Sequence, residues 1–514
     1  MTSSIRGVNP ATGLLLEPAF PEAAAEDVDR AALAAEAAFP AYAALEPARR
    51  SAFLRAIGDE ITALGDALLE RAQAETGLPL PRLAGERGRT VNQLRMFADL
   101  LDEGSWVEAR IDRALPDRQP APRPDLRRML VPLGPVAVFG ASNFPLAFSV
   151  AGGDTAAALA AGCPVVVKAH PGHPGTSDLV ARATSAAAAK TGMPTGVFGM
   201  VQGASVAVGQ ALVTHPAIKA VGFTGSLRGG RALFDAAARR REPIPVYAEM
   251  GSSNPLFVLP RALKERGEAI AKGLAASVTL GAGQFCTNPG LTVLAPADAG
   301  ETFLRAVGDA LAGSPAGTVV HAGIKSAYDA GLAERVSLPG VAMAARAAAK
   351  GAHPSTEAQP ALLVTDAATF AARAPLHEEL YGPATVAVRC TTRDELLDLA
   401  RGLEGHLTAT VHGTEADLAE HADLLAVLGR KVGRLVVNGF PTGVEVSPAM
   451  HHGGPYPATT DARATSVGTA AIARFARPLC FQDVPEALLP AELRSANPRG
   501  IWRLLDGAFT KEPV

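Results

Sequence analysis

The sequence has few cysteines, few aromatic residues and no excess of either charge. Its 514 residues include four cysteines, 5% aromatic residues, and 48 basic against 51 acidic side chains, for a formal net charge of −3. The cysteines form no CxxC pair and no spacing typical of a metal site. The charge balance gives no electrostatic surface for nucleic acid. We therefore expect a reducing compartment, no metal and no nucleic-acid partner.

Long hydrophobic runs and targeting signals are also missing. No run reaches the roughly 18 apolar residues that a membrane-spanning helix needs. The N-terminal stretch MTSSIRGVNPATG has no basic segment followed by an apolar one, so it lacks the pattern of a secretory signal. We expect a cytoplasmic protein with no membrane partner. Its 48% hydrophobic content and its length predict two or three globular domains.

The first part of the chain has helical spacing, and the middle part alternates between strands and helices. Helices are predicted over residues 25–39, 49–77 and 89–104, with breaks at Pro40 and Pro47 and ends at Gly77 and Gly104. The proline-rich segment 114–128 predicts an extended arm. Apolar strands follow at 136–140, 164–169, 196–203 and 218–225, and a second alternating region runs from about 254 to 440. This alternation indicates parallel sheets covered by helices.

Cys286 lies in the segment GAGQFCTNPG (residues 281–290), among small and polar residues. A nucleophilic cysteine must be reachable by its substrate and must become a thiolate, and small neighbours leave room for both substrate and cofactor. A loop cysteine without a role is the competing interpretation. The surroundings of Cys286 alone do not decide between the two.

Two other polar residues follow strand-like segments. Glu249 precedes a Gly-Ser-Ser turn, at a position where sites lie in open α/β sheets, and partial burial there is expected to raise the pKa of its carboxyl toward that of a useful base. Asn143 follows a Gly-Ala-Ser turn, where its amide could donate to an oxyanion. Taken singly, a solvated glutamate and a turn-forming asparagine are the commoner explanations of these two patterns.

Two segments suggest a nucleotide. Lys168 ends a predicted strand, where its ammonium could hold a ribose hydroxyl or a phosphate. The segment FTGSLRGGR (223–231) places a glycine turn between a strand and a helix, where N–H groups can bind a pyrophosphate. Its spacing, Gly225 and then Gly230, is not GxGxxG, so this signal is weak alone.

In this order, the motifs resemble the aldehyde dehydrogenase superfamily. Asn143, Lys168, Gly225-Ser226, Glu249, Cys286 and EELYGP (378–383) follow one another, and the resemblance covers roughly residues 5 to 480. It implies an α/β fold with a Rossmann-type cofactor domain, an α/β catalytic domain and a small β oligomerisation flap. It also implies a homodimer or homotetramer that acts on a small-molecule aldehyde.

The resemblance implies a role for each matching residue. Cys286 resembles the nucleophile, Asn143 the oxyanion donor and Glu249 the base that activates water for deacylation. The cofactor ligands that it implies are Lys168, Gly225, Ser226, Gly230 and Glu379. Phe144, Phe285 and Thr287 flank the chemistry and are expected to shape the substrate pocket.

The chain departs from the usual family pattern at two places. The sequence EMGSS (249–253) replaces the usual Glu-Leu-Gly-Gly-Lys, and MHHGGPYPATTD (450–461) replaces a PFGG-x-K segment. These departures resemble the branch of 2-oxoglutarate semialdehyde (2,5-dioxopentanoate) dehydrogenases. The His451–His452 pair and the His170–His173 pair are expected to serve in turns or at the cofactor and not to bind a metal.

The resemblance also bears on cofactor and substrate. Pro171 stands where NAD-preferring members often carry an acidic residue, so NADP is expected, with NAD possible. Lys168, or a protonated His170 or His173, could face the 2′-phosphate. Arg89, with Gln93 one helical turn later, is the candidate clamp for a substrate carboxylate. A solvated helix arginine fits the pattern equally well.

The predicted domains are a cofactor domain, a catalytic domain and a bridging element. NAD(P) binding is assigned to 1–110 and 129–248, catalysis to 249–440, oligomerisation to 111–128 and 468–482, and 483–514 is left as a C-terminal tail. Three alternatives stay open: another semialdehyde or a fatty aldehyde as substrate, a redox-free thiol esterase, and a non-catalytic binding protein on the same fold.

Overall fold

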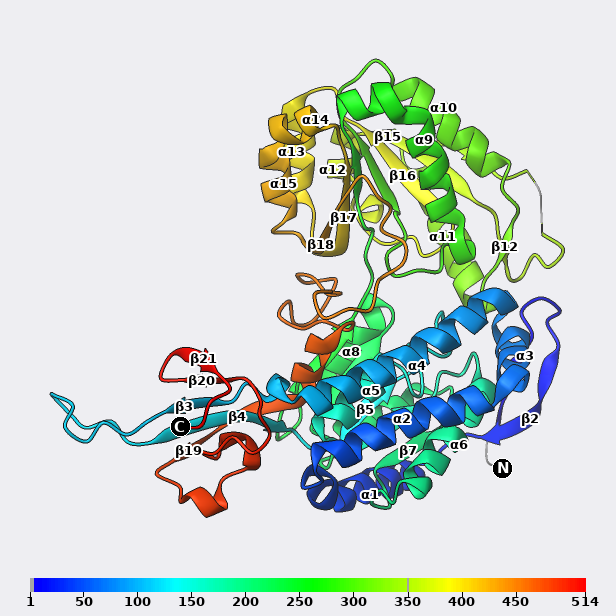
Figure 1. Ribbon diagram of the computed structural model, residues 1–514. Coiled ribbons are helices and arrows are strands. Elements are labelled where there is room, and N and C mark those ends of the chain that lie inside the picture. The colour runs from blue at the N-terminus through cyan, green and yellow to red at the C-terminus, as the bar shows by residue number, and fades with distance from the viewer. Residues whose placement is uncertain (1–3, 349–350) are drawn as a thin grey trace.

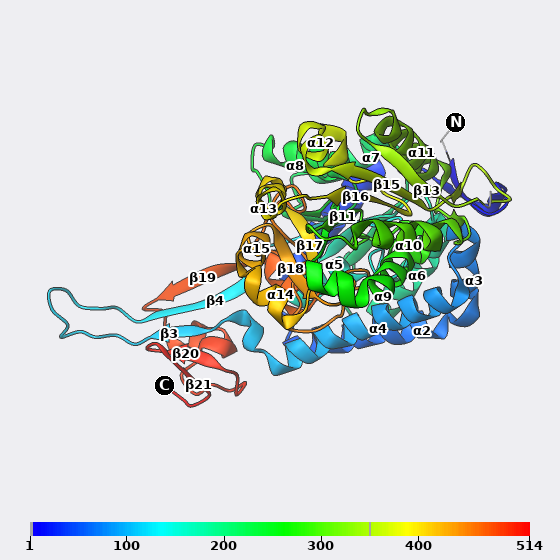
Figure 2. The ribbon, with the colours of Figure 1, turned by 90° about the horizontal axis from the view of Figure 1, so that it is seen from above.

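The structure is a computed structural model that describes residues 4–348 and 351–514. Two α/β units lie one above the other in Figure 1, and an arm of strands projects from the lower unit. The same arm extends away from both units in the view from above (Figure 2). Across the described residues, no helix is both long and apolar enough to cross a membrane.

The lower unit is built on a five-stranded parallel sheet in the order β7-β6-β5-β8-β9. Its strands are β5 (Val136–Phe139), β6 (Val165–Lys168), β7 (Phe198–Val201), β8 (Ala220–Thr224) and β9 (Val246–Glu249). The crossover helices are α5 (Gly153–Ala161), α6 (Pro174–Lys190), α7 (Val206–Thr214) and α8 (Leu227–Ala238). The strand order reverses between β5 and β8, and ligands bind open α/β sheets at the carboxyl ends of strands at such a point.

Four N-terminal helices complete the lower unit: α1 (Ala25–Ala43), α2 (Pro47–Ala63), α3 (Gly65–Thr76) and α4 (Leu80–Glu103). The break predicted at Pro40 is wrong, because this proline lies inside the last turn of α1. The single helix predicted over 49–77 is also wrong. It is interrupted at Gly65, whose φ of +59° is left-handed. Gly77 and Gly104 end α3 and α4 in left-handed conformations, as their positions predict.

The upper unit is built on a seven-stranded sheet in the order β13-β15-β16-β11-β10-β17-β18. Only β13 (Ala342–Arg346) runs antiparallel to its neighbour in this sheet. The other strands are β10 (Leu256–Val258), β11 (Leu291–Leu294), β15 (Ala361–Asp366), β16 (Ala384–Arg389), β17 (His406–His412) and β18 (Val432–Val437). The covering helices are α9 (Pro260–Thr279), α10 (Gly300–Ala312), α11 (Ala322–Ser337), α12 (Ala367–Ala372), α13 (Arg393–Gly402), α14 (Glu415–Glu420) and α15 (Ala422–Leu428).

The arm is a separate five-stranded sheet in the order β19-β4-β3-β20-β21. Its strands are β3 (Arg110–Asp112), β4 (Leu126–Pro132), β19 (Ala476–Gln482), β20 (Arg503–Leu505) and β21 (Ala508–Thr510). β4 pairs with β19 over their whole lengths. The segment that the sequence left as a tail therefore supplies two of the five strands, and Ile501 and Leu493 from it are fully buried in the core of the arm.

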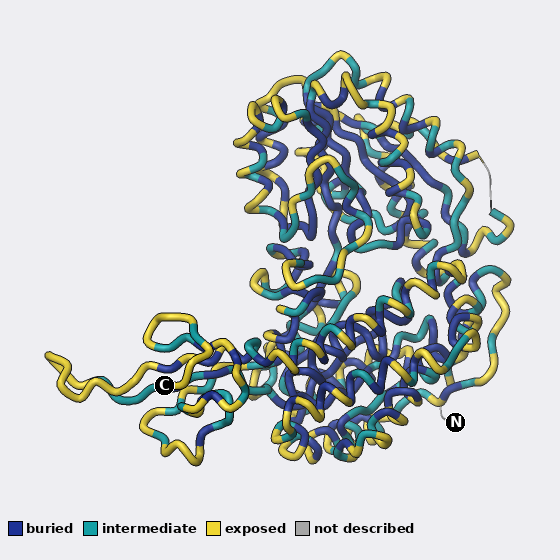
Figure 3. The backbone as a smooth tube through the Cα atoms, in the orientation of Figure 1, coloured by how far each residue is buried: buried dark blue, intermediate teal, exposed yellow. Residues whose placement is uncertain are grey.

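Small elements occupy the edges of the units. Two short antiparallel pairs are β1 (Ser4–Val8) with β2 (Leu15–Pro21), and β12 (Gly317–Thr318) with β14 (Glu357–Ala358). Short 3-10 turns lie at Ser105–Val107, Leu280–Gly283, Ala374–Leu376, Thr469–Phe475, Glu486–Leu488 and Ala491–Leu493. Buried residues are concentrated in the central strands of the two large sheets, and exposed residues lie on the outer helices and the arm (Figure 3).

Candidate active site

Cys286 lies on a loop between the 3-10 turn Leu280–Gly283 and strand β11. Gly281, Ala282 and Gly283 all have left-handed φ angles, of 57°, 58° and 71°. A Cβ atom on Gly283 would lie 2.2 Å from the backbone carbonyl carbon of Gly382, so only glycine fits there. The tight turn brings the loop against the segment that carries Glu379.

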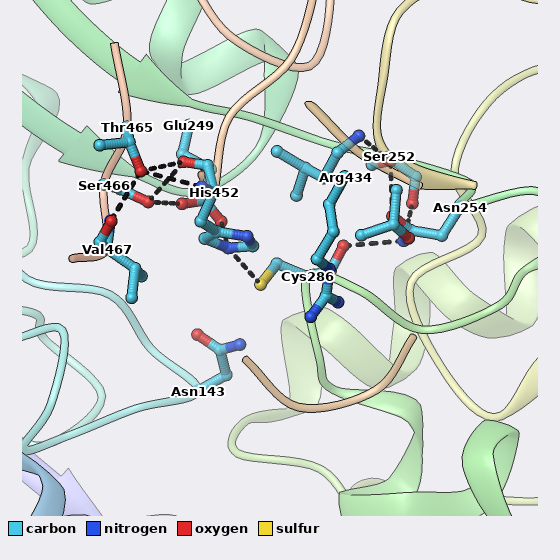
Figure 4. Close-up of polar contacts among 12 residues, drawn as sticks. Asn143, Glu249, Ser252, Asn254, Cys286, Arg434, His452, Thr465, Ser466 and Val467 are labelled. Atoms are coloured by element: carbon cyan, nitrogen blue, oxygen red, sulfur yellow. Dashed lines mark hydrogen bonds and ion pairs between the residues drawn. The ribbon is translucent and has the colours of Figure 1, made fainter. Parts of the chain in front are cut away.

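The Cys286 thiol contacts a histidine from a distant segment. His452 Nε2 lies 3.3 Å from Cys286 Sγ and 3.0 Å from Glu249 Oε1. Glu249 is the last residue of β9, at the carboxyl edge of the parallel sheet, and its other oxygen accepts a hydrogen bond from the Ser466 hydroxyl. Figure 4 shows the thiol, the imidazole and the carboxylate in sequence. Both contacts are made by the same nitrogen, so Nε2 accepts the thiol proton only when it carries no hydrogen, and it donates to Glu249 once it has taken that proton.

The expected rise in the pKa of Glu249 is wrong. Burial does favour the neutral acid, but the charge of His452, its hydrogen bond and the Ser466 hydroxyl outweigh burial and hold the pKa of the Glu249 carboxyl below its ordinary value. Glu249 is therefore an ionised carboxylate at neutral pH.

The Cys286 thiol is not intrinsically acidic. Burial, followed by the negative charge of Glu249, raises the pKa of Cys286 well above its usual value, and the positive charge of Arg89 only partly offsets this. A thiol in this environment stays protonated until a neighbour accepts the proton. His452 is the neighbour placed to do so.

Two asparagines lie beside this cluster. Asn254 donates to the carbonyl oxygens of Cys286 at 2.8 Å and Asn288 at 2.9 Å, which fixes the nucleophile loop. The buried Asn143 amide donates to Gln284 O at 2.9 Å, two residues before the thiol. Figure 4 places Asn143 on the side of the sulfur away from Glu249. The same amide also hydrogen-bonds with the Tyr381 hydroxyl, so both of these groups lie near Cys286.

Of the residues predicted to bind the cofactor, Lys168, Gly225, Ser226 and Gly230 lie at the carboxyl edge of the lower sheet, and Glu379 lies in the upper unit. Ser226 is the N-cap of α8, and its hydroxyl accepts from the Gly229 N–H at 3.2 Å. Gly230 lets α8 pack closely on the end of β9, since a Cβ there would lie 2.7 Å from the Met250 side chain. No described residue accepts a hydrogen bond from the N–H groups of Leu227 and Arg228. This helix start therefore fits an anionic pyrophosphate.

Lys168 ends β6 as predicted, and burial lowers the pKa of its ammonium to about 8, with Glu22 opposing the shift. The suggestion that a protonated His170 or His173 faces a phosphate is wrong. Burial lowers the pKa of both rings, and the charge of Lys168 adds to the effect. His173 is also fully buried, with Nε2 bonded to Ala141 O at 2.9 Å.

Glu379 lies across the loop from Glu249. Burial raises the pKa of its carboxyl to about 7, the charge of Glu249 raises it further, and a hydrogen bond from the Ser252 N–H opposes the shift. A Cβ on Gly251 would come within 2.6 Å of a Glu379 carboxylate oxygen. The glycine in EMGSS therefore makes room for this carboxylate.

Aromatic rings and arginine side chains lie together near the nucleophile loop. Phe144 and Phe285 meet edge to face at 5.4 Å, and the Arg82 guanidinium lies 5.2 and 4.8 Å from their ring centres. Arg89 lies 5.5 Å over Phe148, and its buried Nε has no partner. Burial lowers the pKa of the Arg89 guanidinium, and a Cys286 thiolate, together with Glu86 and Glu249, would oppose this shift.

Thr287 and Arg434 lie on the upper-unit side of the site. The Thr287 hydroxyl is buried beside Cys286 and has no hydrogen-bond partner. Arg434 extends from β18 to the neighbourhood of the thiol (Figure 4), and its guanidinium donates to Pro441 O at 2.6 Å and Gly443 O at 3.1 Å. Two cationic side chains, Arg89 and Arg434, therefore flank the nucleophile from different units.

Sequence reasoning missed several residues of the site. His452 was interpreted only as one half of a histidine pair, while Ser466, Arg82 and Arg434 were not singled out. The one available signal was the HHGG segment, which departs from the family pattern. Taken alone, His452 follows a methionine and a histidine and precedes two glycines, in a stretch with no strand or helix signal.

The site and fold match one family. The aldehyde dehydrogenase family model matches residues 1–460. The chain is 54% identical to alpha-ketoglutaric semialdehyde dehydrogenase 2 of Azospirillum brasilense, over 98% of this chain and 96% of that one. It is 48% identical to the alpha-ketoglutaric semialdehyde dehydrogenase of Acinetobacter baylyi, over 96% and 93%. The solved structure of PnpE from Pseudomonas sp. WBC-3 with nicotinamide adenine dinucleotide has a TM-score of 0.79 at 23% identity, covering 96% of each chain.

The chain belongs to the aldehyde dehydrogenase family. The protein is an NAD(P)-dependent aldehyde dehydrogenase, as the motifs predicted, and the redox-free and non-catalytic alternatives are set aside. The α/β fold expected from the resemblance is confirmed.

Proposed function

We propose that this enzyme oxidises 2-oxoglutarate semialdehyde to 2-oxoglutarate, with NADP+ as the preferred acceptor and NAD+ as a second. The substrate rests on the two curated relatives, which carry that activity in their names, and on the cationic side chains beside the thiol. The single observation that carries the reaction is the contact series from Cys286 Sγ through His452 Nε2 to Glu249 Oε1.

The first step is attack of the Cys286 sulfur on the aldehyde carbon. His452 accepts the thiol proton as the carbon–sulfur bond forms, and Glu249 stabilises the imidazolium that results. The carbonyl oxygen becomes an oxyanion, and the Asn143 amide and the Cys286 N–H are proposed to stabilise it. A bound nicotinamide cofactor would supply the hydride acceptor for the same carbon, and Cys286 would then hold the acyl group as a thioester.

The second step is hydrolysis of that thioester. Water attacks the acyl carbon, and its proton passes to the Glu249–His452 pair. The carbon–sulfur bond then breaks to release the carboxylic acid and the Cys286 thiol. Because the Glu249 carboxylate is ionised at neutral pH, it is ready to accept this proton without prior deprotonation.

Cofactor selection is proposed from the turn after β6. Pro171 offers no carboxylate to repel a 2′-phosphate, and Lys168 offers a positive charge at the end of the strand. Glu22 lies close enough to influence Lys168, but two backbone N–H groups, of Ala204 and Ser205, occupy one of its oxygens. Gly225, Ser226 and Gly230 are proposed to hold the pyrophosphate, and Glu379 the nicotinamide ribose.

Arg89 is proposed to bind the carboxylate of the substrate, with Phe144, Phe285 and Thr287 shaping the pocket. Arg89→Met keeps the side-chain volume and removes the charge. We expect KM for 2-oxoglutarate semialdehyde to rise at least about tenfold, in line with loss of one charge-assisted contact, while KM for hexanal stays within twofold. An equal rise for both aldehydes would show that Arg89 supports the pocket and does not recognise charge.

The proposal is tested by following cofactor reduction in the near ultraviolet with 2-oxoglutarate semialdehyde, succinate semialdehyde and hexanal, each with NADP+ and NAD+. The highest kcat/KM is expected for the first aldehyde with NADP+. A preference for succinate semialdehyde or hexanal would overturn the substrate, and a strong preference for NAD+ would overturn the cofactor, each independently of the other.

A further inference from the structure

Three potential metal ligands converge at the nucleophile. Glu249, Cys286 and His452 each present one ligand atom, a carboxylate oxygen, a thiol sulfur and an imidazole nitrogen, and these atoms lie within 4.8 Å of one another. They come from the end of β9, the loop before β11, and the segment between β18 and the arm. This grouping is invisible in the sequence, where no metal-ligand spacing occurs.

The distances suit a tetrahedral ion. Zinc bonds of about 2.3 Å to sulfur and about 2.0 Å to nitrogen or oxygen place tetrahedral ligand atoms roughly 3.3 to 3.6 Å apart. The observed separations are 3.3 Å for Cys286 Sγ to His452 Nε2 and 3.0 Å for His452 Nε2 to Glu249 Oε1. The ligand atoms need to separate by a few tenths of an ångström to admit the ion. Rotation of the Cys286 side chain then brings the sulfur to a suitable distance from the Glu249 carboxylate oxygen.

The supporting contacts hold two of the ligands in place. The Ser466 hydroxyl binds one Glu249 oxygen, so the other oxygen, which contacts His452 Nε2, is the one that faces the ion. The His452 backbone is fixed by its N–H bond to Thr465 Oγ1 at 2.8 Å and by the Ser466 N–H bond to its carbonyl at 2.8 Å. Outer contacts of this kind orient metal ligands and raise affinity.

The local charge also balances. A divalent ion bound to the Cys286 thiolate and the Glu249 carboxylate forms a unit with no net charge. The two negative ligands thereby offset the repulsion between the ion and the guanidinium groups of Arg89 and Arg434. The thiol proton and any proton on His452 Nε2 are released to solvent as the metal–sulfur and metal–nitrogen bonds form, and no electron is transferred. Soft thiolate and imidazole ligands favour Zn²⁺ over Mg²⁺ or Ca²⁺.

We propose that Glu249, Cys286 and His452 form an inhibitory Zn²⁺ site, with water as the fourth ligand. Bound Zn²⁺ occupies the sulfur lone pair, the imidazole nitrogen and the carboxylate together, so it stops aldehyde oxidation and shields the thiol from alkylation. Removal of the ion by a chelator restores aldehyde oxidation and the reactivity of the thiol toward alkylation. This inference depends on the cluster geometry and not on which aldehyde is the substrate.

The test measures binding without aldehyde or cofactor. Metal-free enzyme is titrated with Co²⁺, whose bond to a thiolate gives a charge-transfer absorbance, and with Zn²⁺ in competition with a chromogenic chelator. We expect one ion per chain and the thiolate band. His452→Asn and Cys286→Ser are each expected to weaken binding by more than about 100-fold, because they remove a direct ligand and loss of an outer contact alone costs 10–100-fold.

Matched controls use nearby groups outside the cluster. His451→Asn alters the adjacent imidazole, and Cys480→Ser removes the exposed cysteine of the arm. Both are expected to keep the affinity and the inhibition, which EDTA reverses. Retention of Zn²⁺ by both His452→Asn and Cys286→Ser, or no binding by the parent enzyme at 100 µM Zn²⁺, would overturn the site. Circular dichroism establishes that each variant is folded.

Discussion

At the scale of single residues, the contact between His452 and Cys286 distinguishes this site. The thiol has a raised pKa, so its reactivity depends on a neighbour that takes its proton. The neighbouring imidazole is almost fully buried and lies against an ionised carboxylate. These contacts support the proposal that His452 accepts the proton of the nucleophile, with the Glu249 carboxylate beside the imidazole.

Replacement of His452 by Asn is expected to lower kcat/KM by about 10²–10⁴, the usual contribution of a general base. The alkylation rate of Cys286 by iodoacetamide is expected to fall with it, because the thiol loses its proton acceptor. His451→Asn is the matched control and should change neither rate. Normal alkylation in His452→Asn would place the proton acceptor elsewhere.

Glu379 makes stability depend on pH. Its folded-state pKa is raised from 4.5 to about 7, so the folded protein holds this proton more tightly than the unfolded chain. Its effect on stability is therefore favourable at low pH and is lost as pH rises from about 4.5 through 7. Glu379→Gln cannot ionise, so we expect it to gain about 1–2 kcal/mol relative to the parent between pH 5 and pH 8.

Urea unfolding at both pH values measures this difference. Glu378→Gln, at the exposed neighbouring position, is the matched control for the loss of one negative charge. If the two variants respond to pH in the same way, the effect comes from net charge and not from the buried carboxyl.

At the scale of elements, backbone conformations at the nucleophile loop position the thiol. Gly283 has a φ of 71° and lies against the Gly382 backbone, so an added methyl group would both strain φ and displace the loop. We expect Gly283→Ala to lose most activity and about 3 kcal/mol of stability or more, since backbone strain of about 1–2 kcal/mol adds to a steric clash.

The matched control for Gly283→Ala is Gly13→Ala. Gly13 has a φ of 72°, but no atom lies within 4 Å of the position that an added methyl group would take. This variant isolates the backbone strain, and activity should stay at the parent level. Thermal unfolding and cofactor reduction measure both variants, and equal losses would show that the clash with Gly382 is relieved by movement of the loop.

At the scale of the whole molecule, the two units and the arm meet around the site. The lower sheet supplies Glu249 and the turn with Asn143, the upper unit supplies Cys286, and the segment that crosses between β18 and the arm supplies His452. The arm carries the β4–β19 pair that we propose to contact a second copy in a homodimer or homotetramer. At the opposite side of the arm sheet, β20 and β21 are the last two strands.

Removal of residues 483–514 is expected to destabilise the arm. It takes away β20 and β21 and the fully buried Leu493 and Ile501, and it uncovers Ile111. Exposed apolar surface and an unpaired strand edge promote association. Light scattering coupled to size exclusion should show aggregates or a changed oligomer. An unchanged oligomer with parent stability would mean that the C-terminal strands are dispensable.

The sequence by itself determined the strand–helix alternation, the parallel sheets and the order of Asn143, Lys168, Glu249 and Cys286. These follow from local patterns: apolar runs of strand length, glycine turns and polar residues just after strands. The four strands predicted at 136–140, 164–169, 196–203 and 218–225 coincide with β5, β6, β7 and β8 to within a few residues.

Only the tertiary structure decided the surroundings of those residues. His452 lies 166 positions after Cys286, and no local pattern connects the two. The pKa of Glu249 falls where burial alone predicted a rise, because His452 and Ser466 approach it from more than 200 positions away. Proximity, burial and charge depend on long-range packing, which a reading of neighbouring residues does not contain.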